Sequence, residues 1–82
     1  MFTLIFSELF DKSFTKIKDK PVRKQIWKKI LELENRAPIG KKLKENPYWS
    51  IHISRYRLIY ELKGDQIIIA DILQRKKGYR EI

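Results

Sequence analysis

Trp49–Tyr60 reads WSIHISRYRLIY, and this stretch decides the fold because its apolar and polar side chains alternate in two short runs. Alternation with a period of two predicts half-buried β-strands, and Ser54-Arg55 falls between the runs as the expected turn. We therefore predict an antiparallel hairpin with one apolar face. The other face carries Ser50, His52 and Arg57, so the only histidine of the chain shares a face with an arginine.

Upstream of the hairpin, the sequence predicts one strand and two helices. Phe2–Phe6 is short and rich in residues that favour strands. Ser7 is the expected N-cap of a first helix, and the proline at position 21 suits the first turn of a second helix. The apolar stripes expected to face the core are Leu9, Phe10, Phe14 and Ile17 on the first helix, and Val22, Ile26, Ile30 and Leu33 on the second.

Downstream of these helices, Asn35–Gly40 is an expected break and Lys41–Pro47 an expected charged connection to the hairpin. Lys63-Gly64-Asp65 is the next expected turn. Gln66–Leu73 is apolar on both faces, which favours a central strand over an edge strand. The element order β-α-α-β-β-β predicts a two-layer α+β fold, with a helical hairpin packed on one face of an antiparallel sheet. The other face is expected to stay largely open to a partner or to the chain's own tail.

Composition narrows the possible functions. A chain of 82 residues with 43% hydrophobic content predicts a single globular domain, residues 1–82. There is no cysteine, which excludes disulfides and thiolate metal sites. No apolar run reaches the length of a membrane span and no signal peptide is expected, so we expect a cytoplasmic protein without membrane association.

The charge balance is the strongest global feature. Lysine and arginine number 19 against 10 acidic residues, which gives a net charge of +9. Such a charge favours a nucleic acid, an anionic membrane surface or an acidic protein as partner. Of these three, we expect a nucleic acid. The plainer alternative is a solvated, lysine-rich surface.

Three segments together resemble the RelE/ParE superfamily of toxins from toxin–antitoxin systems. They are Gly40–Leu43 (GKKL), the hairpin pattern W-x-I-x-I-x-x-Y-R-L-I-Y, and Arg75–Tyr79 (RKKGY). None of the three is specific alone, but the combination with small size, basic charge and the expected element order covers nearly the whole chain. The resemblance implies a RelE-like fold and a cognate antitoxin, which we expect to be acidic and to fold on binding.

The resemblance leaves two activities open. RelE-like members are ribonucleases that cut mRNA in the ribosomal A site, without a metal or another cofactor, by attack of a ribose 2′-hydroxyl on the adjacent phosphate. ParE-like members inhibit DNA gyrase and have no known nuclease chemistry. The first is our expectation for this chain, and the second is its alternative. A basic RNA-binding domain without chemistry is a third possibility.

The resemblance also assigns three candidate catalytic residues. Arg57 falls on the arginine of the family's Y-R-[LV]-[IV]-Y pattern, which contacts the scissile phosphate in RelE-like members. Arg75 falls on an arginine that stabilises the transition state, and Tyr79 on a tyrosine that stacks on a base or orients the phosphate. The plainer roles are an ion pair between Arg57 and Glu61, a solvated tail for Arg75, and packing on the sheet for Tyr79.

His52 is a fourth candidate, at a position where many RelE-like members have lysine or arginine. Histidine exchanges a proton near neutral pH, and a nearby Arg57 would favour the neutral form that can act as a base. A polar surface residue is the plainer reading. Ser50 is a departure from the family, because RelE-like nucleases commonly place a base there and serine carries no charge.

Five lysines are expected to make looser contacts with the RNA backbone, and these are Lys41, Lys42, Lys44, Lys76 and Lys77. We expect no metal site, because a single histidine and scattered carboxylates do not form a ligand set.

Overall fold

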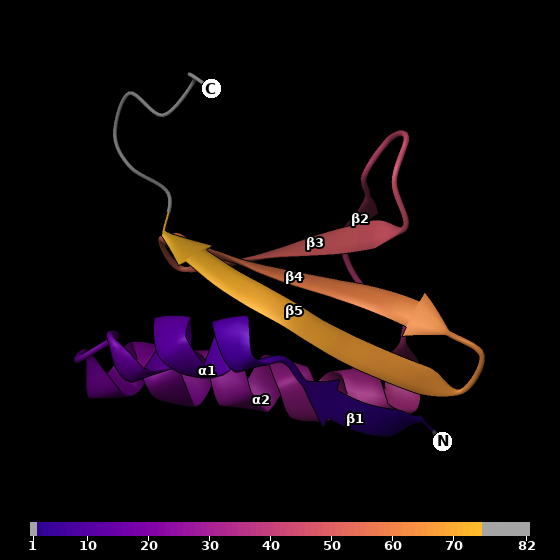
Figure 1. Ribbon diagram of the computed structural model, residues 1–82. Helices are drawn as coiled ribbons and strands as arrows, with labels where there is room; N and C mark the ends of the chain where they lie inside the picture. Colours follow the sequence, from indigo (N-terminus) through magenta and orange to yellow (C-terminus); the bar gives the residue numbers. More distant parts are fainter. Residues whose placement is uncertain (1, 75–82) are drawn as a thin grey trace.

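The computed structural model of the protein describes residues 2–74, and four of the predicted site residues, Arg75, Lys76, Lys77 and Tyr79, lie outside that range. The described elements are β1 (Thr3–Phe6), α1 (Glu8–Thr15), α2 (Lys20–Arg36), β2 (Lys41–Lys42), β3 (Tyr48–Ile53), β4 (Tyr56–Lys63) and β5 (Gln66–Gln74). Figure 1 shows the two helices side by side in one layer and the strands β2 to β5 in the other. The predicted α+β fold with two layers is therefore confirmed.

The sheet has the strand order β1-β5-β4-β3-β2, so β5 lies between two strands as its apolar faces predicted. One detail of the prediction was wrong, because the sheet is mixed: β1 runs parallel to β5, with Leu4 opposite Ile67. Strands joined by tight turns must be antiparallel, but β1 is joined to β5 only through the whole intervening chain. Its direction is therefore not constrained by a turn. The structure also adds β2, which pairs Lys41 with Ser50 inside the segment predicted as a connection.

The helices begin at the positions that Ser7 and Pro21 predicted. The Ser7 hydroxyl accepts a hydrogen bond from Phe10 N at 3.0 Å, and the Asp19 carboxylate accepts one from Val22 N at 3.3 Å. The predicted stripe of α2 is buried throughout. The stripe predicted for α1 was partly wrong: Leu9 is 57% exposed, and Ile17 is buried but follows the helix, because α1 ends at Thr15.

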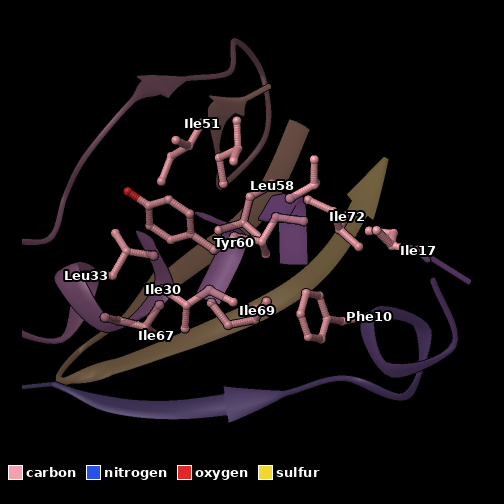
Figure 2. Packing of buried hydrophobic residues seen from close by; sticks show 13 residues of the cluster. Phe10, Ile17, Ile30, Leu33, Ile51, Leu58, Tyr60, Ile67, Ile69 and Ile72 are labelled. Carbon is pink, nitrogen blue, oxygen red and sulfur yellow. The ribbon is translucent and has the colours of Figure 1, made fainter. Parts of the chain in front are cut away.

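The core fills the space between the helices and one face of the sheet. Figure 2 shows Tyr60, Leu58 and Ile69 from the sheet packed with Ile30 and Leu33 from α2. All five side chains are completely buried. Leu58 and Tyr60 point into this core. Ile59 lies between them on β4, so its side chain points to the opposite face of the sheet.

The first helix also closes an edge of the sheet. β1 pairs with β5 only as far as Ile69. Beyond that point the Ser7 hydroxyl donates to Ala70 O at 2.6 Å, and the Ser13 hydroxyl donates to Asp71 Oδ1 at 2.7 Å. Polar side chains of α1 thus bind the part of β5 that β1 does not reach. Within residues 2–74, no helix is long and apolar enough to cross a membrane.

Candidate functional site

The predicted hairpin brings His52 and Arg57 together on the sheet face that the helices do not cover. β3 and β4 pair in antiparallel register with His52 directly opposite Arg57. The turn between them is tight, and Ser54 adopts a φ of 56° within it. Arg57 Nη2 lies 3.3 Å from His52 Nε2, which is within hydrogen-bond distance. The neighbouring residues Ile51 and Leu58 are buried in the core, so they fix this pair on the outer face.

The contact between the two side chains has one possible donor and one possible acceptor. A guanidinium carries only donors, so Nε2 of His52 must accept the hydrogen bond. An imidazole that accepts on Nε2 is neutral and carries its proton on Nδ1. In this contact Nε2 is the acceptor, and it can take a proton from a substrate only after the guanidinium has moved to another acceptor.

Arg57 has further binding capacity that the described residues do not use. Its Nε is buried, and within residues 2–74 no acceptor satisfies it. A buried donor without a partner costs about 1–3 kcal/mol. An anion that accepted from this nitrogen would remove that cost, and a guanidinium is suited to phosphate oxygens because its donors form a rigid fork.

A hollow of about 460 Å³ lies beside this pair. Its lining comes from β2, β3, β4 and the residues on either side of β2, and consists of Gly40, Lys41, Leu43, Ser50, His52 and Arg57. We call this set the sheet hollow. It combines two positively charged side chains, Lys41 and Arg57, with His52, which can exchange a proton. Ser50 also lines the hollow and is only 8% exposed. The arrangement can bind an anionic group and accept a proton from it.

The close approach of β2 to β3 depends on Gly40. This residue has a φ of +96°, and a Cβ built on it would lie 2.3 Å from Ser50 O. No other residue fits, because a side chain would collide with the backbone of β3. Gly40 therefore allows the following residue, Lys41, to enter the sheet hollow from β2.

Tyr60 holds the loop that leads into this site. Its hydroxyl donates to Ile39 O at 2.5 Å and accepts from Ile39 N at 2.8 Å. Burial raises the pKa of the Tyr60 hydroxyl above its usual 10.0, and the hydrogen bond with the Ile39 backbone offsets part of that rise. This role of Tyr60 was not predicted from the sequence, although a polar hydroxyl at a predicted core position of β4 indicates a buried hydrogen bond.

The predicted lysines are separated by the structure. Lys41 lines the sheet hollow, whereas Lys42 and Lys44 do not. Lys42 Nζ instead donates to Asn46 O at 2.9 Å across the β2–β3 loop, and Lys44 is exposed in that loop. The assignments of Arg75, Lys76, Lys77 and Tyr79 stay predictions.

No candidate metal centre is found in the described part of the chain, where no three acidic or histidine side chains gather in a suitable group.

The helical layer carries a second, more apolar hollow of about 420 Å³, which is lined by Phe14, Lys20, Arg23, Lys24 and Trp27. We call it the helix hollow. The Arg23 guanidinium lies 4.3 Å from the centre of the Phe14 ring and donates to Phe14 O and Ile17 O, so this cation is fixed in place. Trp27 is 42% exposed and Leu31, one turn further along α2, is 47% exposed. Large apolar side chains left open beside cations favour a partner with an apolar and acidic surface.

Comparison with known proteins places the chain among toxins. The family described as the ParE toxin of the type II toxin–antitoxin system parDE matches residues 4–79. No curated protein sequence matches the chain significantly.

Solved structures match over nearly their whole length. The isolated E. coli RelE toxin has a TM-score of 0.83 at 22% identity, with 96% of this chain and 89% of that chain covered. A chain of the RelB–RelE antitoxin–toxin complex from Methanococcus jannaschii has a TM-score of 0.77 at 30% identity, covering 92% of this chain and 94% of that one. The chromosomal ParDE system of P. aeruginosa gives a TM-score of 0.78 at 15% identity, with 93% and 98% covered.

Proposed function

Because this chain belongs to the RelE/ParE superfamily of type II toxin–antitoxin toxins, we propose that it is an endoribonuclease that cleaves mRNA on the ribosome. The proposal places the protein in the cytoplasm, where its substrate is found. The superfamily contains two activities, so the choice between them rests on the residues of the sheet hollow.

One observation carries the proposal, and it is the pairing of Arg57 with His52. The arginine has a buried Nε that no described acceptor satisfies, and the histidine accepts through Nε2. The Arg57 guanidinium can bind a phosphate, and His52 can accept a proton. Lys41 adds a cation to the same hollow. Inhibition of a protein partner does not need a proton acceptor beside an anion-binding arginine.

The proposed reaction needs no metal. The ribose 2′-hydroxyl loses its proton to His52 Nε2 and attacks the adjacent phosphorus. The bond to the 5′-oxygen breaks, and this oxygen takes up a proton from water. The products are a 2′,3′-cyclic phosphate and a free 5′-hydroxyl. Arg57 and Lys41 stabilise the additional negative charge on the phosphorane.

Two further roles are proposed from the resemblance alone. Arg75 would add a second guanidinium to the transition state and Tyr79 would stack on a base or orient the phosphate. Both follow β5 in the sequence, and β5 pairs with β4 up to the contact of Tyr56 with Gln74. Gln74, the last described residue, therefore lies beside the strand that carries Arg57.

The test is a translation reaction supplied with the protein. The message is mapped for new 5′-hydroxyl ends, with Arg57→Ala as the inactive control. Cuts that depend on the ribosome and on Arg57 support the proposal. A message that stays intact at protein concentrations that arrest the growth of cells would contradict the proposal.

Gyrase inhibition is the second candidate, because the matching family is described by its ParE toxin. A supercoiling assay with purified gyrase distinguishes it from cleavage. Inhibition that survives Arg57→Ala, with no cut message, would replace the nuclease assignment.

We also propose an acidic antitoxin as partner, bound at the helix hollow through an amphipathic helix. The net charge of +9 and the exposed Trp27 among Lys20, Arg23 and Lys24 support this chemistry. The Methanococcus jannaschii relative is itself part of an antitoxin–toxin complex.

A further inference from the structure

A third hollow, of about 290 Å³, adjoins the sheet hollow. It is lined by Gln25, Lys28, Lys29, His52, Ile53 and Ser54, and we call it the α2 hollow. His52 lines both hollows, so the two meet at this side chain. A ligand that leaves Arg57 along β3 therefore enters a second basic surface without crossing the core.

The cations of the α2 hollow come from a helix whose rotation is fixed. Val22, Ile26, Ile30 and Leu33 are buried in the core, so Lys28, between the second and third of them, points away from it. Lys28 is exposed. The Lys29 side chain is 33% exposed, and its Nζ donates to Glu32 Oε1 at 3.1 Å.

The edge of β3 leaves the way between the hollows open. β2 pairs only with Trp49 and Ser50, although β3 continues to Ile53. Within the described residues no strand borders β3 beyond Ser50 on that side. Unpaired strand edges offer polar backbone groups, and lysines beside them act as mobile point charges for phosphates.

We propose that a single-stranded polynucleotide crosses the edge of β3, with one phosphate at Arg57 and a neighbouring phosphate in the α2 hollow at Lys28 and Lys29. The inference rests on the proposed function only in taking RNA as the polynucleotide. Lys28 and Lys29 are binding residues that extend the site beyond the reacting phosphate. Glu32 opposes this binding, because its carboxylate competes with the phosphate for the ammonium group of Lys29.

The experiment separates binding from cleavage. Fluorescently labelled RNA with 2′-O-methyl riboses has no free hydroxyl for attack, so anisotropy reports binding alone. A dinucleotide reaches only the sheet hollow, whereas a dodecamer also reaches the α2 hollow. The double variant Lys28→Gln/Lys29→Gln is compared with Lys12→Gln/Lys63→Gln, which removes the same charge from exposed positions of α1 and β4.

We expect the α2 variant to weaken dodecamer binding and to leave dinucleotide binding equal to that of the control variant. Each phosphate that is no longer neutralised lowers the slope of log affinity against log salt by about 0.7 for a single strand, so the slope should fall by about 0.7. Glu32→Gln should have the opposite effect and strengthen dodecamer binding, because it frees Lys29.

The inference and the proposed function fail separately. If the two double variants bind the dodecamer with the same affinity and salt slope, or if the wild type does not bind it at low salt, the α2 hollow is not a phosphate site. That result leaves cleavage of mRNA intact as a proposal. If mRNA is not cleaved but the dodecamer still depends on Lys28 and Lys29, the nuclease assignment fails and the polynucleotide path stands.

Discussion

Arg57 and His52 face each other across β3 and β4, with Nη2 of the arginine 3.3 Å from Nε2 of the histidine. The contact occupies the nitrogen through which His52 would accept a proton. A phosphate that binds the guanidinium competes for the same donor, because charge-assisted bonds to phosphate are stronger than bonds to a neutral ring. Substrate binding would thus release the base at the point where it is needed.

Removing the guanidinium should abolish most cleavage. Arg57→Ala should lower the single-turnover rate on programmed ribosomes by roughly a hundred- to a thousand-fold, the usual loss for one transition-state donor. Arg36→Ala, an exposed position at the end of α2, is the charge-matched control and should cleave like the wild type. Circular dichroism checks that both variants fold. Equal rates in the two variants would remove Arg57 from the mechanism.

The role of His52 should be visible in the pH dependence of cleavage. A base must be neutral, so wild-type activity should rise as pH passes through the range where an imidazole loses its proton. His52→Ala should be slower and should lose this rise. His52→Lys should act only at higher pH if the position supplies a base, and should retain the wild-type profile if it supplies only a cation. The measurement is the single-turnover rate across the pH range.

Gly40→Ala should disturb the site more than a glycine change elsewhere. A Cβ at this position would lie 2.3 Å from Ser50 O, so β2 must move away from β3 and take Lys41 with it. Gly64 also has a positive φ, of +59°, but its added Cβ would meet nothing within 4 Å. Gly64→Ala should therefore cost only about 1–2 kcal/mol of stability from backbone strain and leave cleavage unchanged. Similar effects of the two changes on cleavage would argue against the contact.

Tyr60→Phe should destabilise the fold by about 1–3 kcal/mol, because Ile39 loses both hydrogen-bond partners. The raised pKa of Tyr60 adds a pH effect with a definite sign. The folded state keeps its proton where the unfolded state releases it, so wild-type stability should fall as pH rises above about 10. Tyr60→Phe should not show this component. Urea denaturation at about pH 8 and about pH 11 measures it, with Tyr48→Phe as the control.

Trp27→Ala should weaken the complex with the cognate antitoxin. Buried interface tryptophans often contribute 2 kcal/mol or more, so the dissociation constant should increase by roughly thirty-fold. Leu73→Ala is the matched control, since Leu73 is also 42% exposed but lies on β5 rather than on α2. Calorimetry of the purified pair measures both values. If Leu73→Ala weakens binding and Trp27→Ala does not, the antitoxin binds the sheet and not the helix hollow.

Local chemistry made much of this fold predictable from the sequence. The alternation in Trp49–Tyr60, the serine cap at position 7 and the proline at position 21 each act within a few residues, and all three have the predicted roles. The parallel pairing of β1 with β5 was not predictable in this way, because no local signal sets the direction of a strand that pairs over more than sixty residues.

The candidate site also has features that local sequence patterns predict and features that they do not. The shared face of His52 and Arg57 follows from strand periodicity, and the structure places them opposite each other. The bond from Tyr60 to Ile39 and the collision that requires Gly40 join segments separated by loops, so the sequence does not show which residues meet there. The α2 hollow is of the same kind, because Lys28 and His52 meet only through packing of the helix on the sheet.

The pairing of β1 with β5 also determines at which stage of synthesis the toxin can fold. β1 is made early and its strand partner, Gln66–Gln74, is made late. Contacts between distant parts of a chain form slowly and only after both parts exist. A ribosome that translates this message must therefore have made Gln66–Gln74 before the sheet can close beside Arg57. If the protein cleaves mRNA on the ribosome as proposed, the nascent chain should be inactive until β5 has been made and has paired with β4.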